Sequence, residues 1–253
     1  MNLVAKKIHQ RLQPVKRSER TTAVKLAGKT HLARYGIDQF ITKISSQAPP
    51  GSFLLDGGAG SCRYKNFVPH ARYVGLDQSS KLHRVFGDID VRGDLSDLPF
   101  RDNSFGATLS VEVLEHVKEP GLVLAELYRV LQPGGKLFLV APQGWEEHGA
   151  PYDYFRFTSF GLRYLFERVG FEVLSIEPLG GYFWYLGHRI AKSYRYLFPA
   201  GRSRIRKFFD APLRPPGRFL LRWAIPYLCF YLDRTDRKKS FTLNYGAVCR
   251  KPL

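Results

Sequence analysis

The segment Phe53-Leu54-Leu55-Asp56-Gly57-Gly58-Ala59-Gly60 combines an apolar run, a carboxylate and closely spaced glycines. The apolar run predicts a buried strand that ends at Asp56, and the glycines predict a tight turn directly after it. A turn without Cβ atoms lets a ligand lie against backbone N–H groups. We therefore expect Asp56, Gly58 and Gly60 to bind a small ligand that carries a positive charge and polar groups.

Polar residues also follow the next predicted strands. Asp77 ends the apolar segment 73–77, Asp94 lies in the acidic loop 93–100, and Ser110 lies near the end of the segment 108–111. A carboxylate at the tip of the second strand can accept hydrogen bonds from both hydroxyls of a ribose. The apolar flanks of loop 93–100 suit an adenine, so the pattern favours a ligand that contains a nucleoside.

The elements that must position these residues alternate between strand and helix. Short apolar runs at 53–55, 73–76, 108–111 and 136–140 are typical of buried parallel strands. Residues 119–131 have a helical apolar period between the last two of these strands. The sequence thus predicts an α/β, doubly wound fold, with a mainly parallel sheet and helices on both faces. Such sheets bind ligands at the carboxyl ends of their strands.

The second half of the chain follows a different pattern. Thr158–Val169 predicts a helix with Thr158 as its N-cap and Gly170 just past its end. Strands are predicted at 171–176 and 241–249, with more than sixty residues rich in aromatics and arginine between them. Four regions are therefore expected: a basic helical N-terminal extension (1–48), a ligand-binding core (49–178), an aromatic and basic insertion (179–238) and a last core strand (239–253).

Charge is distributed unevenly along the 253 residues, whose net charge is +17. Residues 1–34 hold 9 basic and 1 acidic residues (+8), residues 35–188 hold 14 and 18 (−4), and residues 189–253 hold 16 and 3 (+13). Basic ends around a slightly acidic centre indicate attraction to phosphate, on a membrane surface or on nucleic acid. A solvated charged surface is the alternative.

Cysteine usage and the apolar segments bear on location. Cys62, Cys229 and Cys249 are odd in number and widely separated, which predicts neither a disulfide framework nor a metal site. The N-terminus has no apolar signal region, and no run reaches the roughly 20 apolar residues of a spanning helix. We expect a cytoplasmic protein that can bind the inner face of a membrane peripherally.

These motifs, in this order and spacing, resemble those of the class I S-adenosylmethionine-dependent methyltransferases, in particular the small-molecule enzymes. The resemblance covers roughly residues 50–178 and the last strand. It includes Phe105-Gly106-Ala107-Thr108 and Leu131-Gln132-Pro133-Gly134-Gly135-Lys136-Leu137 before the fourth and fifth strands. It implies a Rossmann-like sheet of seven strands and S-adenosylmethionine as the cofactor.

The resemblance also assigns the cofactor contacts by position. It assigns the methionine end to Asp56, Gly58, Gly60, Ser110 and Val111, the ribose to Asp77, and the adenine to Gln78, Asp94 and Leu95. One departure is Cys62, which stands where the family often has a third glycine. The same residue argues against a dinucleotide loop, because that fingerprint requires Gly-x-Gly-x-x-Gly.

The expected reaction is an in-line displacement at the sulfonium methyl, for which alignment of the reactants matters most. A base is needed only where the acceptor must lose a proton. His148, after the fifth strand, is the first candidate base and His116 is the second, although the sequence slightly favours a surface loop residue at His148. The aromatic segment 152–157 could line an acceptor pocket or close the core.

Glu112, Glu115 and His116 form Glu-x-x-Glu-His, whose members share one face of a helical turn and could hold a divalent cation. Some quinone-biosynthesis methyltransferases are similar here and use a metal. However, Leu-Glu-His is common in family members with no known metal, so we expect no metal site.

The insertion guides the choice of acceptor. Its segment 219–232 mixes leucines and aromatics with Arg222, which is typical of an interfacial element. The sequence thus predicts a methyltransferase for a hydrophobic or lipid-linked small molecule, such as a quinone, isoprenoid or glycolipid, at an anionic membrane surface. The insertion could also be a helical cap that buries its aromatics on the sheet.

Two alternatives remain. The basic ends could serve an RNA methyltransferase, but Ser110-Val111-Glu112-Val113 differs from the Asn/Asp-Pro-Pro-Tyr motif of amino-methylating nucleic-acid enzymes, and no nucleic-acid module is recognisable. Nucleic acid is therefore not an expected partner. A non-catalytic membrane or protein adaptor is the second alternative, disfavoured because Asp56, Asp77 and Asp94 are all present.

Overall fold

The computed structural model describes residues 30–78, 89–199 and 211–253. Seven strands form one sheet in the order β3-β2-β1-β4-β5-β7-β6. The strands are β1 (Phe53–Gly57), β2 (Arg72–Asp77), β3 (Val91–Arg92), β4 (Phe105–Val111), β5 (Leu131–Pro142), β6 (Glu172–Pro178) and β7 (Asn244–Arg250). Pairs from β3 to β5 are parallel, whereas β7 is antiparallel to both of its neighbours. The predicted doubly wound, mainly parallel seven-stranded fold is confirmed.

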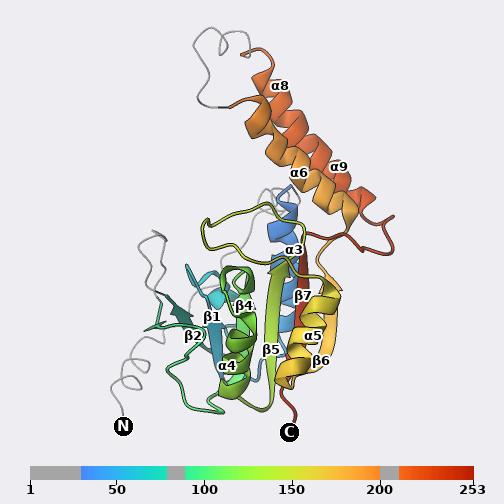
Figure 1. Cartoon of the computed structure of the whole chain (residues 1–253). Helices are drawn as coiled ribbons and strands as arrows, with labels where there is room; N and C mark the ends of the chain where they lie inside the picture. The colour runs from blue at the N-terminus through green and yellow to red at the C-terminus, as the bar shows by residue number, and fades with distance from the viewer. Residues whose placement is uncertain (1–29, 79–88, 200–210) are drawn as a thin grey trace.

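Helices cover both faces of this sheet (Figure 1). The helices of the core are α3 (Leu32–Ser45), α4 (Pro120–Val130) and α5 (Ser159–Val169), with the short 3₁₀ turns η1 (Arg63–Phe67) and η2 (Leu114–His116). One face packs Leu124 and Leu127 of α4 and Phe166 of α5 into the larger apolar cluster. The other face packs Ile37 and Phe40 of α3 into a second cluster. The parallel strands are therefore buried on both sides, which explains their continuous apolar runs.

The helix α3 lies within the segment 1–48 that the sequence assigned to an N-terminal extension. Its residues Ile37, Phe40 and Ile41 are almost fully buried against the sheet. This part of the extension therefore belongs to the core. The predicted helical character of residues 1–29 lies outside the described residues.

The caps predicted for α5 are present. The Thr158 side chain accepts a hydrogen bond from the Gly161 N–H at 3.0 Å, and Gly170 ends the helix with a φ of 105°. Such a cap satisfies an N–H that has no partner inside the helix, and glycine adopts the left-handed conformation without strain.

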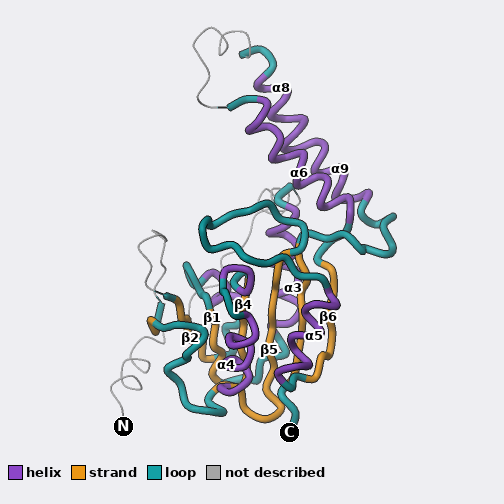
Figure 2. Tube along the Cα trace, viewed as in Figure 1, coloured by secondary structure: helices purple, strands orange, loops and turns teal. Residues whose placement is uncertain are grey.

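The insertion forms a helical arm, which we define as α6 (Tyr182–Leu197), α8 (Arg214–Phe219), the π-helical stretch η3 (Leu220–Ala224) and α9 (Ile225–Leu232). The α6 helix packs along η3 and α9, and the arm projects away from the sheet (Figure 2). It follows β6, so it leaves the molecule at the carboxyl ends of the parallel strands. The base of the arm contacts the core where α6 packs against α3.

Candidate functional site

Asp56 lies near the carboxyl end of β1, where its side chain is almost completely buried. The Tyr73 hydroxyl on β2 donates a hydrogen bond to Asp56 Oδ2 at 2.5 Å. Burial raises the pKa of Asp56 to about 7, the Tyr73 hydrogen bond opposes this rise, and the charge of Asp77 adds to it. A carboxyl group with this pKa gains negative charge most readily when a cation binds beside it.

The glycine turn after β1 has the backbone geometry that the sequence predicts. Gly58 has a φ of 80°, and a Cβ there would lie 2.3 Å from Val113 Cγ2. Gly60 has a φ of 51° and open space where a Cβ would lie. Its N–H donates to Asp77 Oδ2 at 2.7 Å, so the turn is tied to the tip of β2. A ligand can approach this turn at its backbone.

Cys62 also lies in the left-handed region, with a φ of 52°. This conformation favours glycine, which agrees with the third glycine that the family resemblance implies at this position. The thiol packs over Gly75 of β2, because a Cβ on Gly75 would lie 2.9 Å from Cys62 Sγ. The departure from the family pattern is thus accommodated by a glycine on the neighbouring strand.

The residues predicted to contact the nucleoside lie beside this turn, but one of them, Leu95, is buried. The Gln78 amide donates to Asp94 Oδ2 at 2.8 Å, and Ser96 donates to Asp94 Oδ1 through its N–H and its hydroxyl. Leu95 is buried in the core cluster under Gly57. Asp77, Gln78 and Asp94 are therefore adjacent at one edge of the sheet, while Leu95 supports the loop from below.

Ser110 and Val111 end β4 next to the glycine turn, because β4 pairs with β1 in parallel register. Both are buried. The chain then turns at Glu112, whose φ is 55°, and enters η2. Burial raises the pKa of Glu112, although Arg34 lies 3.6 Å from its carboxylate.

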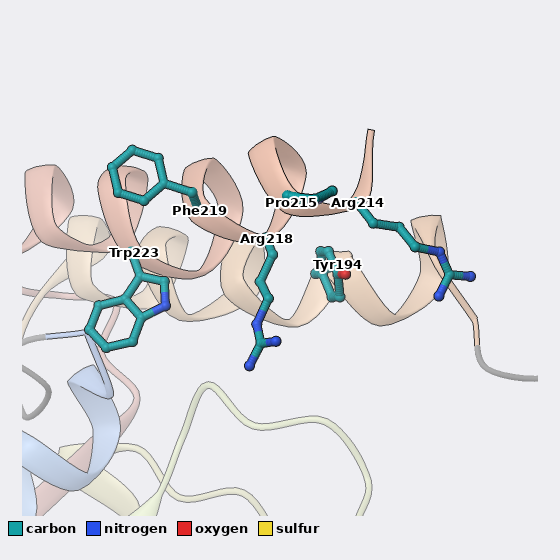
Figure 3. Close-up of a pocket in the computed structure, with 6 residues that line it drawn as sticks. All are labelled: Tyr194, Arg214, Pro215, Arg218, Phe219 and Trp223. Atoms are coloured by element: carbon teal, nitrogen blue, oxygen red, sulfur yellow. The ribbon is translucent and has the colours of Figure 1, made fainter. Parts of the chain in front are cut away.

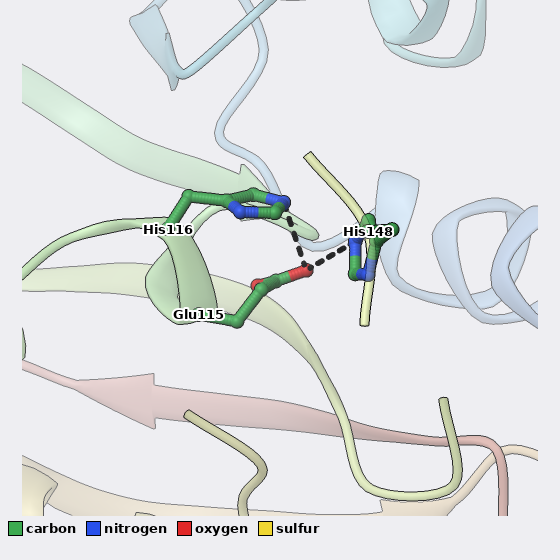
Figure 4. A group of neighbouring side chains, drawn as sticks. All are labelled: Glu115, His116 and His148. Carbon is green, nitrogen blue, oxygen red and sulfur yellow. Dashed lines mark ion pairs between the residues drawn. The ribbon is translucent and has the colours of Figure 1, made fainter. Parts of the chain in front are cut away.

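Glu115, His116 and His148 form a cluster at the ends of β4 and β5 (Figure 4). Glu115 is fully buried, and burial raises its pKa to about 8. Both imidazoles point to the same carboxylate oxygen, with Nε2–Oε1 distances of 3.7 Å for His116 and 3.8 Å for His148. The two predicted bases are thus brought together, although they are far apart in sequence.

The loop 143–157 is fixed by its own hydrogen bonds. Arg156 pairs with Asp153 at 2.7 Å and also donates to the carbonyls of Trp145 and Glu146. The Arg156 hydrogen bond lowers the pKa of Asp153 well below its usual range. Glu146 pairs with Arg189 and Lys192 of α6, so the loop is also tied to the arm. These contacts hold the loop 143–157 in place beside the carboxyl ends of β4 and β5.

The aromatic segment 152–157 divides between the two roles that the sequence left open. Phe157 is buried in the core, whereas Tyr152, Tyr154 and Phe155 are exposed. The last of these aromatics therefore closes the core, and the first three remain accessible to an acceptor.

Sequence reasoning missed Tyr73 as a partner of Asp56 and Glu146 as a link to the arm. The sequence could have indicated Tyr73, because it lies on the strand that pairs with β1. It is two residues before Gly75, which lies opposite Asp56. The pairing of Glu146 with α6 depends on where the arm folds back, which no local pattern indicates.

Comparison with known proteins identifies the domain that carries this site. Residues 55–139 match the model of the family described as "Methyltransferase domain". Residues 55–139 carry a methyltransferase domain, and the sheet around them has the class I fold. S-adenosylmethionine is the cofactor of this domain, as the resemblance of the loop motifs implied, and Asp56, Asp77 and Ser110 lie within the matched range.

Three relatives cover parts of the methyltransferase domain. A fatty-acid O-methyltransferase of Mycolicibacterium smegmatis is 33% identical over 124 residues, 44% of this chain and 45% of its own. A tRNA (carboxymethyluridine(34)-5-O)-methyltransferase of Arabidopsis thaliana is 28% identical over 128 residues, 48% and 31% of the two chains. A demethylmenaquinone methyltransferase of Renibacterium salmoninarum is 41% identical over 97 residues, which are 36% of this chain and 41% of its own. The chain thus spans less than half the length of these relatives.

A solved structure extends the likeness of the methyltransferase domain to most of the fold. The [4+2]-cyclase SpnF superimposes with a TM-score of 0.54 at 18% identity and covers 84% of this chain and 80% of its own. At this identity the likeness concerns the fold alone. One scaffold hosts different reactions, so the acceptor must be inferred from this chain's own residues.

Proposed function

We propose that this protein transfers a methyl group from S-adenosylmethionine to a hydrophobic or lipid-linked small molecule at a membrane surface. The acceptor atom forms a bond to the methyl carbon while the carbon–sulfur bond breaks, and its electron pair stays on sulfur in S-adenosylhomocysteine. Where the acceptor carries a proton, His148 is the first candidate to receive it. Relatives named for a fatty acid and for demethylmenaquinone support an apolar acceptor.

The observation that carries the proposal is the surface of the helical arm. Phe219 is 66% exposed and Trp223 is 41% exposed, and leucines beside them are exposed as well. Large apolar side chains on a projecting element are unusual unless another phase or partner covers them. An interfacial helix places such residues in the acyl boundary and basic residues at the headgroups.

Basic residues accompany these aromatics on the arm. Arg214 and Arg218 line a hollow of about 500 Å³ together with Tyr194, Pro215, Phe219 and Trp223 (Figure 3). In the close-up both guanidinium groups extend to the same side as the Trp223 ring. No carboxylate among the described residues pairs with either arginine. Anionic headgroups add roughly 1 kcal/mol of attraction per nearby arginine.

The arm and the glycine turn both lie at the carboxyl ends of the parallel strands. The loop 143–157 follows β5 at this end and is tied to the arm, because Glu146 contacts both Arg189 and Lys192 of α6. Tyr152 and Tyr154 of the same loop are exposed and could contact an acceptor that reached the protein along the arm. No described helix is long and apolar enough to cross a bilayer, so the proposed contact is peripheral.

Flotation with vesicles tests the membrane contact. The full chain should float with vesicles of phosphatidylglycerol and phosphatidylcholine and bind weakly to phosphatidylcholine alone. The double variant Phe219→Ser, Trp223→Ser should lose at least roughly tenfold in affinity, since burial of each ring contributes about 1.5–3 kcal/mol. Equal flotation of this variant and the wild type would rule out the arm as the contact.

The matched control replaces two exposed aromatics on the core helix α5, Phe160→Ser and Tyr164→Ser. This variant should float like the wild type, because α5 lies on the face of the sheet and not on the arm. Transfer of radiolabelled methyl groups from S-adenosylmethionine to extracted lipids, measured in the organic phase, tests the reaction itself. Retention of all label in the aqueous phase would contradict a lipid-linked acceptor.

The tRNA-directed relative and the basic ends of the chain favour RNA as a second candidate acceptor. Filter binding with tRNA at physiological salt separates the two proposals. If the Phe219→Ser, Trp223→Ser variant still binds RNA and the wild type does not float with vesicles, RNA becomes the proposed acceptor in place of a lipid. A chain whose melting temperature does not respond to S-adenosylmethionine would instead fit a non-catalytic adaptor.

A further inference from the structure

The Glu115 carboxylate is buried without a compensating partner. Its side chain has no exposed surface, and neither Oε1 nor Oε2 has a hydrogen-bond partner in the described part of the chain. Its backbone carbonyl accepts a hydrogen bond from the Tyr154 N–H at 2.8 Å. A buried carboxylate without hydrogen bonds or a counter-charge is strongly unfavourable. A cation held beside this carboxylate would therefore stabilise it.

Two imidazole nitrogens face this carboxylate. The Nε2 atoms of His116 and His148 lie 3.7 and 3.8 Å from Glu115 Oε1 (Figure 4). These distances are too long for direct hydrogen bonds. The three ligand atoms all lie within 4.8 Å of one another. Ligands at about 2.1 Å from a tetrahedral ion are about 3.4 Å apart, so a single ion fits between them after small side-chain shifts.

Hydrogen bonds at the other ring nitrogens orient both imidazoles. His116 Nδ1 lies 2.5 Å from the Tyr152 carbonyl oxygen, and His148 Nδ1 lies 3.2 Å from the Glu146 carbonyl oxygen. A carbonyl only accepts, so each Nδ1 must carry the proton and each Nε2 keeps its lone pair toward Glu115. Metal-binding histidines are typically held in this way by an outer carbonyl or carboxylate.

We propose that Glu115, His116 and His148 bind one divalent first-row transition-metal ion. Two imidazoles and one carboxylate suit Zn²⁺, Fe²⁺ or Co²⁺ better than Mg²⁺, which prefers oxygen ligands. The partly exposed rings of His116 (29% exposed) and His148 (36% exposed) would let the ion reach the site from solvent. This replaces our expectation of no metal site.

The ligand set differs from the Glu-x-x-Glu-His pattern of the sequence. Glu112 does not belong to the cluster and instead lies 3.6 Å from Arg34. The third ligand is His148, which the loop after β5 brings over Glu115. The site therefore depends on the tertiary fold of this loop and not on one helical turn.

An ion in this place would bind an acceptor oxygen and lower its pKa, which makes that oxygen nucleophilic. The ion would then replace His148 as the group that prepares the acceptor, because His148 Nε2 is occupied. This role rests on the proposed function. The binding of the ion does not, and it is measured without S-adenosylmethionine.

Cobalt titration tests the site. The full chain, free of any histidine tag, is stripped with a chelator and titrated with Co²⁺ while the visible d–d absorption is recorded. We expect one Co²⁺ per chain, displaced by an equivalent of Zn²⁺ and not by millimolar Mg²⁺. His148→Ala, at a half-exposed loop position, and Glu115→Gln should each weaken Co²⁺ binding at least roughly tenfold, as loss of even an outer partner does.

The matched control is His70→Ala. This half-buried histidine contacts the Ala48 carbonyl and belongs to no cluster of possible ligands among the described residues. Its substitution should leave Co²⁺ binding unchanged. Wild-type protein without a 1:1 Co²⁺ signal, or equal affinity in His148→Ala, would overturn the proposal and leave a proton or a water as the occupant. A chain that binds S-adenosylmethionine but no Co²⁺ would refute the metal site alone.

Discussion

At the scale of single residues, we expect Asp56 to make cofactor binding sensitive to pH. Its pKa of about 7 results from burial, which penalises the charged carboxylate. Below that pH the folded protein holds a proton on Asp56, and this proton must leave before the carboxylate can pair with the ammonium group of S-adenosylmethionine. Binding should therefore weaken as the pH falls through about 7 and become nearly constant above it.

Calorimetry at about pH 5.5, 6.5 and 8 measures this effect. We expect the dissociation constant to rise by up to about tenfold per pH unit below 7, with proton release on binding in the same range. Asp56→Asn should lose most of the affinity and the pH dependence, while Glu172→Gln, on β6 at the opposite edge of the sheet, should keep both. A wild-type affinity that does not vary with pH would show that Asp56 does not contact the cofactor.

At the scale of elements, Asp233 determines how the arm is attached. This buried residue follows α9, and its carboxylate accepts from the N–H groups of Gly181 and Trp184 at 3.0 Å. A negative charge at a helix N-terminus is favourable, and these N–H groups have no partner within α6. The base of the arm is therefore closed by a residue fifty positions downstream in sequence.

Asp233→Ala should release this end of α6. We expect a loss of about 1–3 kcal/mol in the local opening free energy, because buried N–H groups would lose their acceptor. Hydrogen exchange of the amides of residues 181–184 measures it. Asp233→Asn keeps an acceptor oxygen without the charge, so its exchange rates should lie between those of the wild type and Asp233→Ala. Unchanged exchange in Asp233→Ala would mean that packing alone holds the arm.

The helix caps of α5 and α6 show which features could be predicted from the sequence. The cap of α5 was predictable because Thr158 and Gly170 adjoin the helix they terminate, and the cofactor turn was predictable because strand, carboxylate and glycines are contiguous. The cap of α6 by Asp233 and the approach of His148 to Glu115 were not. Both depend on how distant segments fold back, and only tertiary packing determines that.

At the scale of the whole molecule, charge separates the arm from the core. Residues 35–188 carry −4 and residues 189–253 carry +13. Because the Debye length falls from about 10 Å at 0.1 M salt to about 3 Å at 1 M, exposed charges attract an anionic surface less at high salt. The proposed membrane contact should therefore combine a salt-sensitive part with a salt-insensitive apolar part.

Flotation at about 0.1 M and 0.5 M NaCl separates the two parts. Wild-type binding to anionic vesicles should fall with salt. Arg214→Gln, Arg218→Gln should weaken binding at about 0.1 M by roughly 1 kcal/mol for each charge removed and make it less dependent on salt. Phe219→Ser, Trp223→Ser should lower binding at both salt concentrations. Binding that is indifferent to salt would assign the contact to the apolar residues alone.

The position of β7 has a consequence for synthesis on the ribosome. It is the last strand along the chain, yet it lies between β5 and β6 and joins them. Until residues 244–250 emerge, β5 and β6 each present an open edge, and such edges pair readily with other chains. The nascent chain must therefore complete the arm before its sheet can close, so slow translation through the arm would prolong the interval in which the protein is most prone to aggregate.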